Sequence, residues 1–91
     1  MKVNVHVLIS GRVQGVWYRA STKQKAEQLG IFGWVRNTKE GHVEAVFEGD
    51  EDNVNKLIDW CYLGPPLAKV ENVKIQKQNE TKSYDKFEIK H

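Results

Sequence analysis

Apolar and polar residues alternate along several short stretches of the chain, a pattern typical of strands with one buried face. The first stretch, residues 3–9, places four apolar side chains on one face: Val3, Val5, Val7 and Ile9. The same alternation predicts later strands at 31–36, 43–47, 70–75 and 87–89. The turn-forming residues 37–41 join the second and third strands into a hairpin. Uneven spacing between Val70 and Val73 indicates a bulge in the fourth strand.

Two other stretches repeat apolar residues every three or four positions, as helices with one buried face do. We predict a first helix over 18–29, ended by Gly30. Its buried face consists of Tyr18, Thr22, Ala26 and Leu29. A second helix opens at Gly49 and Asp50 and ends at the Gly-Pro-Pro segment 64–66. Its buried face consists of Val54, Leu57, Ile58 and Cys61.

The predicted order is strand-helix-strand-strand-helix-strand, with a short terminal strand added. Each helix has one apolar face to bury, so both should cover one face of a mainly antiparallel sheet of four to five strands. This is an α+β fold, the ferredoxin-like split β-α-β sandwich. A chain of 91 residues suffices for one such domain, 1–91, and is too short for two separate cores. The polar, lysine-rich stretch 77–83 is expected to be mobile.

Composition narrows the possible environments and cofactors. The longest apolar stretches fall far short of the roughly 20 residues that a membrane helix needs, and the start lacks a signal-peptide core. We therefore expect a soluble cytoplasmic protein without a membrane partner, and a monomer by default. The single Cys61 cannot form an intrachain disulfide, and the three histidines lack zinc-ligand spacing. We expect no metal and no cofactor.

Charge is distributed unevenly along the chain. Residues 1–39 contain seven Lys or Arg and one acidic residue, whereas the remaining 52 contain seven basic and eleven acidic residues. The net charge of +2 is too small to indicate a nucleic-acid binder. The excess of basic residues in 1–39 favours the binding of an anionic ligand there, although a solvated helix face explains such an excess equally well.

The segment between the first strand and the first helix is a candidate anion site. Gly11 and Gly15 bracket this loop, and Arg19 follows in the first helical turn. Gly15 lets successive N–H groups turn toward one point, and the helix start adds unpaired donors that suit a phosphate. Arg19 opposes the helix dipole, a conflict that a bound anion would resolve.

A second polar residue should reach the same place. The first helix runs back along the sheet and the second strand returns, so Asn37 arrives at the edge where Arg19 begins. By itself, the loop is also explained as a tight connection with a solvated Arg19. The convergence with Asn37 favours an anion-binding site.

Two segments, GRVQGVWYR at 11–19 and GWVRNT at 33–38, resemble the two signatures of the acylphosphatase family. The resemblance extends along nearly the whole chain, including the GPPLA stretch at 64–68 and the FEI ending at 87–89. Members of this family have the ferredoxin-like fold and hydrolyse acyl phosphates to a carboxylate and inorganic phosphate without a metal. The resemblance therefore implies a small-molecule acyl phosphate as substrate.

Carried over by position, the resemblance implies that Arg19 grips the phosphoryl oxygens and that Asn37 holds the attacking water. It also implies a cradle of backbone N–H groups from Gly15, Val16, Trp17, Tyr18 and Arg19. Thr22 and Thr38 would be supporting neighbours. A planar guanidinium can make two parallel bonds to phosphate, and an amide can orient water without titrating, so both residue types suit these roles.

The chain departs from the family pattern at two adjacent positions. Such sequences often have glycine where this chain has Trp17, and phenylalanine where it has Tyr18. The second change is minor. The indole of Trp17 at the loop rim could narrow access for the substrate.

Two other functions fit parts of the sequence. RNA-binding modules share this element order and stack bases on exposed aromatic residues, but the stretch 41–48 has two acids and one aromatic, Phe47, that belongs to the inward face. We expect no nucleic-acid partner. The other alternative is a non-catalytic module that binds phosphate or carbamoyl phosphate, because acylphosphatase-like domains also occur inside larger maturation proteins.

Overall fold

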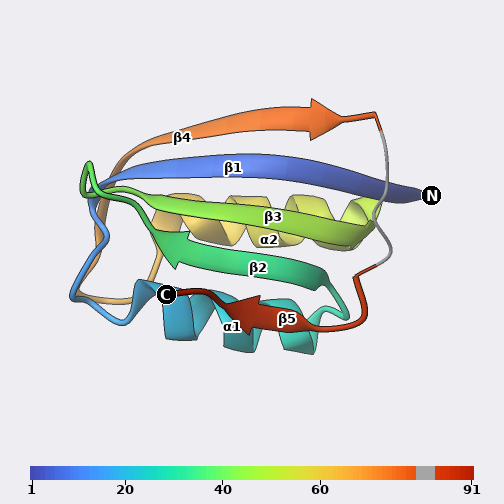
Figure 1. Cartoon of the computed structure of the whole chain (residues 1–91), viewed down its shortest axis with the longest axis horizontal. Helices are drawn as coiled ribbons and strands as arrows, with labels where there is room; N and C mark the ends of the chain where they lie inside the picture. The colour runs from blue at the N-terminus through green and yellow to red at the C-terminus, as the bar shows by residue number, and fades with distance from the viewer. Residues whose placement is uncertain (80–83) are drawn as a thin grey trace.

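Five strands form one open sheet in a computed structural model that describes residues 1–79 and 84–91 (Figure 1). Their order across the sheet is β4-β1-β3-β2-β5. Their bounds are β1 Lys2–Arg12, β2 Phe32–Asn37, β3 Val43–Asp50, β4 Lys69–Gln78 and β5 Phe87–Ile89. All neighbours are antiparallel except β2 and β5, which are parallel. Since β1 and β2 both oppose β3, they run in the same direction, as the predicted crossover requires.

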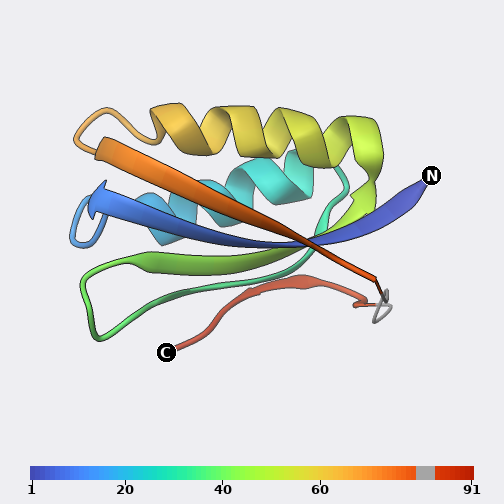
Figure 2. The same cartoon turned by 90° about the horizontal axis from the view of Figure 1, so that it is seen from above.

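The two helices, α1 (Tyr18–Gln28) and α2 (Glu51–Leu63), lie on the same side of the sheet (Figure 2). The core fills the space between them and the inward face of the strands. Among its most buried side chains are Val7, Ile9, Val35, Val43, Phe47 and Leu57. The predicted α+β fold is confirmed, and Phe47 points into the core as predicted.

Local sequence explains where both helices begin and end. α1 buries Tyr18, Thr22 and Ala26 at the predicted helical spacing, and Gly30 follows its end with a φ of 69°. Asp50 precedes α2, and its carboxylate accepts a hydrogen bond from the backbone N of Asp52 at 3.3 Å, which caps the helix. Residues 49 and 50 nevertheless belong to β3, so α2 starts after the predicted opening.

β1 is longer than the prediction, because Gly11 and Arg12 continue it and pair with β4. The register shifts between Ser10 and Gly11 and leaves Glu71 as an extra residue of β4, which confirms the predicted bulge. Gly11 has a φ of 119°, and a Cβ there would collide with the carbonyl oxygen of Lys69. The assignment of Gly11 to the loop was therefore wrong, since this glycine allows two strands to approach closely.

The last two strands occupy opposite edges of the sheet. The expected mobile stretch 77–83 begins inside β4, because Lys77 and Gln78 pair with β1, and residues 80–83 lie outside the described part of the chain. Within the described residues, no helix is both long and apolar enough to cross a membrane.

A charged cluster occupies the face of the sheet that the helices leave open. Glu44 contacts His6 Nε2 through one carboxylate oxygen and Arg36 through the other, both at 2.6 Å. The hydrogen bond with His6, followed by the contacts with Arg36, holds the pKa of Glu44 below its usual value against the opposing effect of partial burial. His6 is thus a paired surface histidine.

Candidate active site

The segments that carry the predicted site residues meet at one end of the sheet (Figure 1). β1 and β2 both run toward this end, where the β1–α1 loop and the β2–β3 hairpin turn back. Arg19 lies in the first turn of α1 and Asn37 is the last residue of β2, so the predicted convergence at this end is confirmed. β5 also ends here, because it runs parallel to β2.

The backbone from Gly15 to Arg19 presents a run of unpaired N–H groups. Within the described part of the chain, none of these five groups donates a backbone hydrogen bond, and the first helical bond runs from Ser21 N to the Trp17 carbonyl at 3.0 Å. Gly15 has a φ of 74°, and a Cβ there would meet nothing within 4 Å, so conformation rather than space favours glycine. Such a helix start attracts anions.

Arg19 adds a full positive charge to this helix start. The first turn of α1 contains no acidic residue. The side chain of Arg19 is half-buried, and it forms no ion pair with any other described residue. The donors of its guanidinium are therefore available to an anion bound at the loop.

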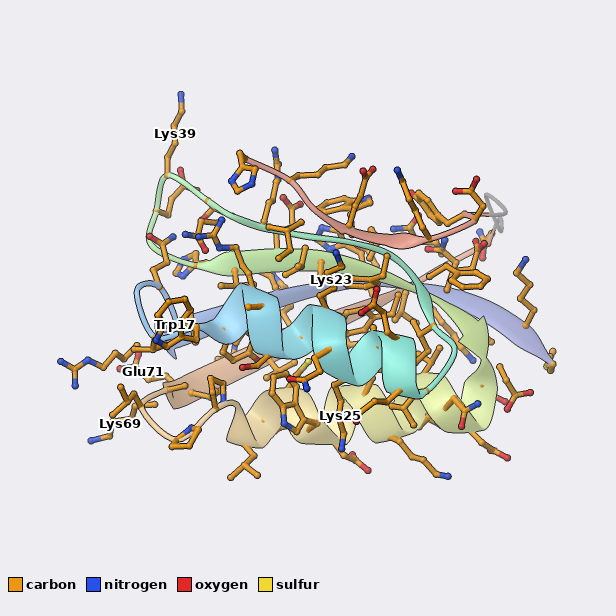
Figure 3. All side chains as sticks on the ribbon, turned by 90° about the horizontal axis from the view of Figure 1, so that it is seen from below. Trp17, Lys23, Lys25, Lys39, Lys69 and Glu71 are labelled. Atoms are coloured by element: carbon orange, nitrogen blue, oxygen red, sulfur yellow. The ribbon has the colours of Figure 1, made fainter. Side chains whose placement is uncertain are left out.

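Trp17 adopts a conformation that is unusual for a large side chain. Its φ of 66° and ψ of 20° place it in the left-handed region, which costs a non-glycine residue about 1–2 kcal/mol. Glycine is the residue that adopts this conformation without strain. The indole is 76% exposed and lies beside the first turn of α1 (Figure 3).

Tyr18 anchors the loop to the core rather than facing the solvent. Its hydroxyl donates a hydrogen bond to the Cys61 carbonyl oxygen at 2.7 Å, and its ring lies 5.6 Å from that of Trp60. Burial raises the pKa of Tyr18, so the phenol stays protonated. Thr22 Oγ1 donates to the Tyr18 carbonyl at 2.8 Å and is itself buried. Both side chains hold the start of α1 in place.

The Asn37 amide oxygen, Oδ1, is buried and accepts no hydrogen bond from the described residues. A buried amide oxygen without a partner carries a substantial desolvation cost unless a water or ligand bonds to it. Asn37 is one of the residues around a hollow of about 500 Å³, together with Arg36 and Thr38. The lining of the cavity beside Arg19 does not include it.

Gln14 connects the loop directly to the hairpin that follows Asn37. Its Nε2 donates to the carbonyl oxygens of Thr38 and His42, each at 2.9 Å. Thr38 closes the hairpin, because its Oγ1 accepts from His42 N at 3.1 Å and its own N–H donates to the His42 carbonyl at 2.9 Å. The role of Gln14 was missed in the sequence, where nothing marks its partners beyond its place inside the GRVQGVWYR motif.

A cavity of about 320 Å³ opens beside Arg19. The loop and the start of α1 contribute most of its lining, and β5 closes it from the side. The lining residues are Val13, Gly15, Trp17, Tyr18, Arg19, Ala20, Ile89 and His91. Sequence reasoning missed Ile89 and His91 as site residues, because their place depends on the parallel pairing of β5 with β2.

Metal-binding and nucleophilic side chains do not gather at this site. The described ranges 1–79 and 84–91 contain no group of three His, Cys, Asp or Glu residues that could hold a metal ion. Cys61 is fully buried on α2, and burial raises the pKa of its thiol to about 12. It is therefore a core side chain, as predicted from its place on the apolar face.

The fold and the loop define a class of small α+β proteins in which a helix start with unpaired backbone N–H groups and a strand-end amide lie at the same end of the sheet. The sequence profile of the acylphosphatase family matches residues 5–89. An acylphosphatase of Methylococcus capsulatus is 51% identical over 85 residues, which cover 93% of this chain and 92% of that protein. The chain belongs to the acylphosphatase family.

Solved structures agree with this assignment. An acylphosphatase from Coxiella burnetii superposes with a TM-score of 0.94 at 39% identity, over 98% of this chain and 93% of that one. The acylphosphatase from Bacillus subtilis gives a TM-score of 0.95 at 27% identity, over 98% and 99% of the two chains. Together these similarities support an acylphosphatase, a hydrolase of acyl phosphates, over the alternative of a non-catalytic phosphate-binding module.

Proposed function

We propose that the enzyme holds the phosphoryl group of its substrate at the start of α1, with Arg19 and the N–H groups of residues 15–19. The observation that carries this proposal is a run of five N–H groups next to a half-buried arginine, none of which has a hydrogen-bond or ion-pair partner among the described residues. Phosphoryl transfer passes through a loose transition state, in which charge spreads over the equatorial oxygens. Donors that are already aimed at those oxygens lower the barrier without reorganising.

Asn37 orients the attacking water in this proposal. Its side-chain amide offers a donor and an acceptor to the water, and an amide does not titrate, so the side chain positions the nucleophile without removing its proton. The water oxygen forms a bond to phosphorus while the bond from phosphorus to the acyl oxygen breaks. The electron pair of that bond leaves with the carboxylate, and the substrate phosphate accepts the proton of the water.

The remaining predicted residues act as supports. Thr22 fixes the first turn of α1 through the Tyr18 carbonyl, and Thr38 fixes the hairpin after Asn37. Gln14 joins the two halves of the site, because it bonds to the hairpin from within the phosphate loop. Phosphate and water must be held at a fixed separation for in-line attack, so we assign Gln14 as a positioning residue.

The test is the hydrolysis of benzoyl phosphate, followed by ultraviolet absorbance with excess chelator. Replacing one preorganised donor group typically lowers the rate by a factor on the order of 10² to 10³, and we expect at least this loss for Arg19→Gln and Asn37→Ala. Arg19→Lys should also lose most activity, because an ammonium cannot make the two parallel bonds of a guanidinium.

Matched controls separate these roles from general effects. Arg12→Gln and Asn55→Ala change exposed residues of the same types outside the cavity, and both should keep turnover within a few-fold of wild type. Circular dichroism and the thermal midpoint establish that each variant is folded. A folded Asn37→Ala enzyme with nearly normal turnover contradicts the water-orienting role, and folded wild type without turnover contradicts catalysis.

We further propose that the enzyme works as a cytoplasmic monomer without a metal or organic cofactor. Light scattering should give the mass of one 10.5 kDa chain at working concentrations. Undiminished turnover after prolonged dialysis against chelator is expected, and a loss that added metal restores would contradict this proposal.

A further inference from the structure

Trp17 combines two features that are unfavourable for a surface side chain. Its backbone lies in the left-handed region, and its large apolar indole is 76% exposed. Strained residues persist where the surrounding structure holds them in place, and they cluster at ligand-binding and catalytic sites. The same segment carries the proposed phosphate loop, and the side chain of Trp17 lies at the start of α1 (Figure 3), where Trp17 lines one cavity together with Arg19.

The lining of the cavity next to Trp17 combines charged and apolar residues. Arg19 contributes a guanidinium, whereas Val13, Trp17 and Ile89 supply the apolar part of the lining. Its volume is about 320 Å³, roughly twice the 150 Å³ of a protein cavity that holds benzene. The cavity therefore has room for a phosphoryl group together with an aromatic ring.

We propose that this apolar part is the acyl-group subsite and that Trp17 makes the enzyme prefer acyl phosphates with an aromatic acyl group. This inference rests on the proposed function, because it places the phosphoryl group at Arg19. The acyl group is bonded to that phosphoryl group and must extend along the same cavity. The indole provides a face for an aromatic ring, and aromatic pairs are favourable beyond the area they bury. None of the described side chains that line the cavity is acidic.

The experiment compares benzoyl phosphate with acetyl phosphate, which share the phosphoryl group and differ in the acyl group. The measured quantity is the ratio of kcat/KM for the two substrates in wild type, Trp17→Gly and Trp17→Phe. We expect Trp17→Gly to lower this ratio about tenfold and Trp17→Phe to restore most of the preference, since both side chains offer a ring face. The loss should fall mainly on the KM for benzoyl phosphate, because the indole contacts the acyl group in ground and transition states alike.

Product inhibition gives a second readout that does not depend on turnover of a particular substrate. Inorganic phosphate reports on the loop and benzoate on the acyl subsite, so the ratio of the benzoate Ki to the phosphate Ki should rise about tenfold in Trp17→Gly. Leu67→Gly is the matched control, because Leu67 is an exposed apolar loop residue outside the cavity. Both ratios should stay at the wild-type value in this variant.

The outcomes separate this inference from the proposed function. A substrate ratio and a Ki ratio that both remain within twofold of wild type in Trp17→Gly overturn the acyl subsite, even when Asn37→Ala behaves as proposed. A lowered substrate ratio that Trp17→Phe fails to restore also overturns it, because loop flexibility then explains the change. If the folded wild type hydrolyses neither benzoyl phosphate nor acetyl phosphate, that result counts against the proposed function instead.

Discussion

Replacing Trp17 by glycine should stabilise the folded protein even though it removes a large apolar side chain. The left-handed backbone costs a non-glycine residue about 1–2 kcal/mol, and glycine adopts it freely. Glycine also raises the conformational entropy of the unfolded chain, and this effect lowers the free energy of unfolding by about 0.4–1 kcal/mol. Little packing is lost, because the indole is 76% exposed. The net gain is about 0.5–1 kcal/mol, equivalent to roughly 3–6 °C in Tm for a domain of this size.

The assay is thermal unfolding followed by circular dichroism, with wild type, Trp17→Gly and Trp17→Ala side by side. Alanine removes the indole but keeps a Cβ in the left-handed region, so this variant should show no comparable gain. The reasoning is refuted if Trp17→Gly melts at or below the temperature of Trp17→Ala. Together with the expected loss of aromatic preference, a gain in Tm would show that the strain at Trp17 serves substrate recognition.

Three further predictions concern contacts around the site and in the sheet. Gln14→Ala removes two 2.9 Å hydrogen bonds and should lower kcat for benzoyl phosphate about tenfold with little change in the phosphate Ki, whereas a purely structural role would lower only Tm. The pKa of Glu44 is lower in the folded protein than in the unfolded chain, so its carboxylate stabilises the fold at a pH above the unfolded pKa of about 4.3. This stabilisation is lost as the pH falls through the folded pKa. The difference in the free energy of unfolding between wild type and Glu44→Gln, measured in urea and under about 1 kcal/mol at pH 7, should therefore shrink as the pH falls below about 4.3. Gly33→Ala should cost more than about 2 kcal/mol in urea unfolding, because its Cβ collides with the Val46 carbonyl oxygen, while Gly41→Ala has open space and should cost less. Equal losses for the two glycines would contradict the steric argument.

Element type followed from the sequence because it depends on neighbouring residues. The alternation of residues 3–9 and the helical spacing of Tyr18, Thr22 and Ala26 predicted a strand and a helix that the structure contains. Even the bulge near Glu71 was visible in the spacing of apolar positions. These patterns are local, and each already states which face of an element is apolar.

The loop was predicted less completely, because its details depend on partners far away in the chain. Gly11 looked like a loop glycine, although it serves the close contact with β4 almost sixty residues later. Gln14 gave no sign that it would bond to the carbonyls of the β2–β3 hairpin. Ile89 reaches the cavity because β5 pairs in parallel with β2, a choice of edge that the pattern of a three-residue strand does not specify.

By itself, the sequence determined the elements, their order and the placement of Arg19 and Asn37 at the same end of the sheet, since period and connectivity restrict an α+β sheet to few arrangements. The tertiary structure alone decided the surroundings of these two residues. It placed Trp17 in a left-handed conformation, buried the Asn37 amide oxygen away from any partner among the described residues, and brought Ile89 to the cavity beside Arg19. Backbone angles, burial and cavity shape arise from the packing of distant segments, and no local pattern encodes them.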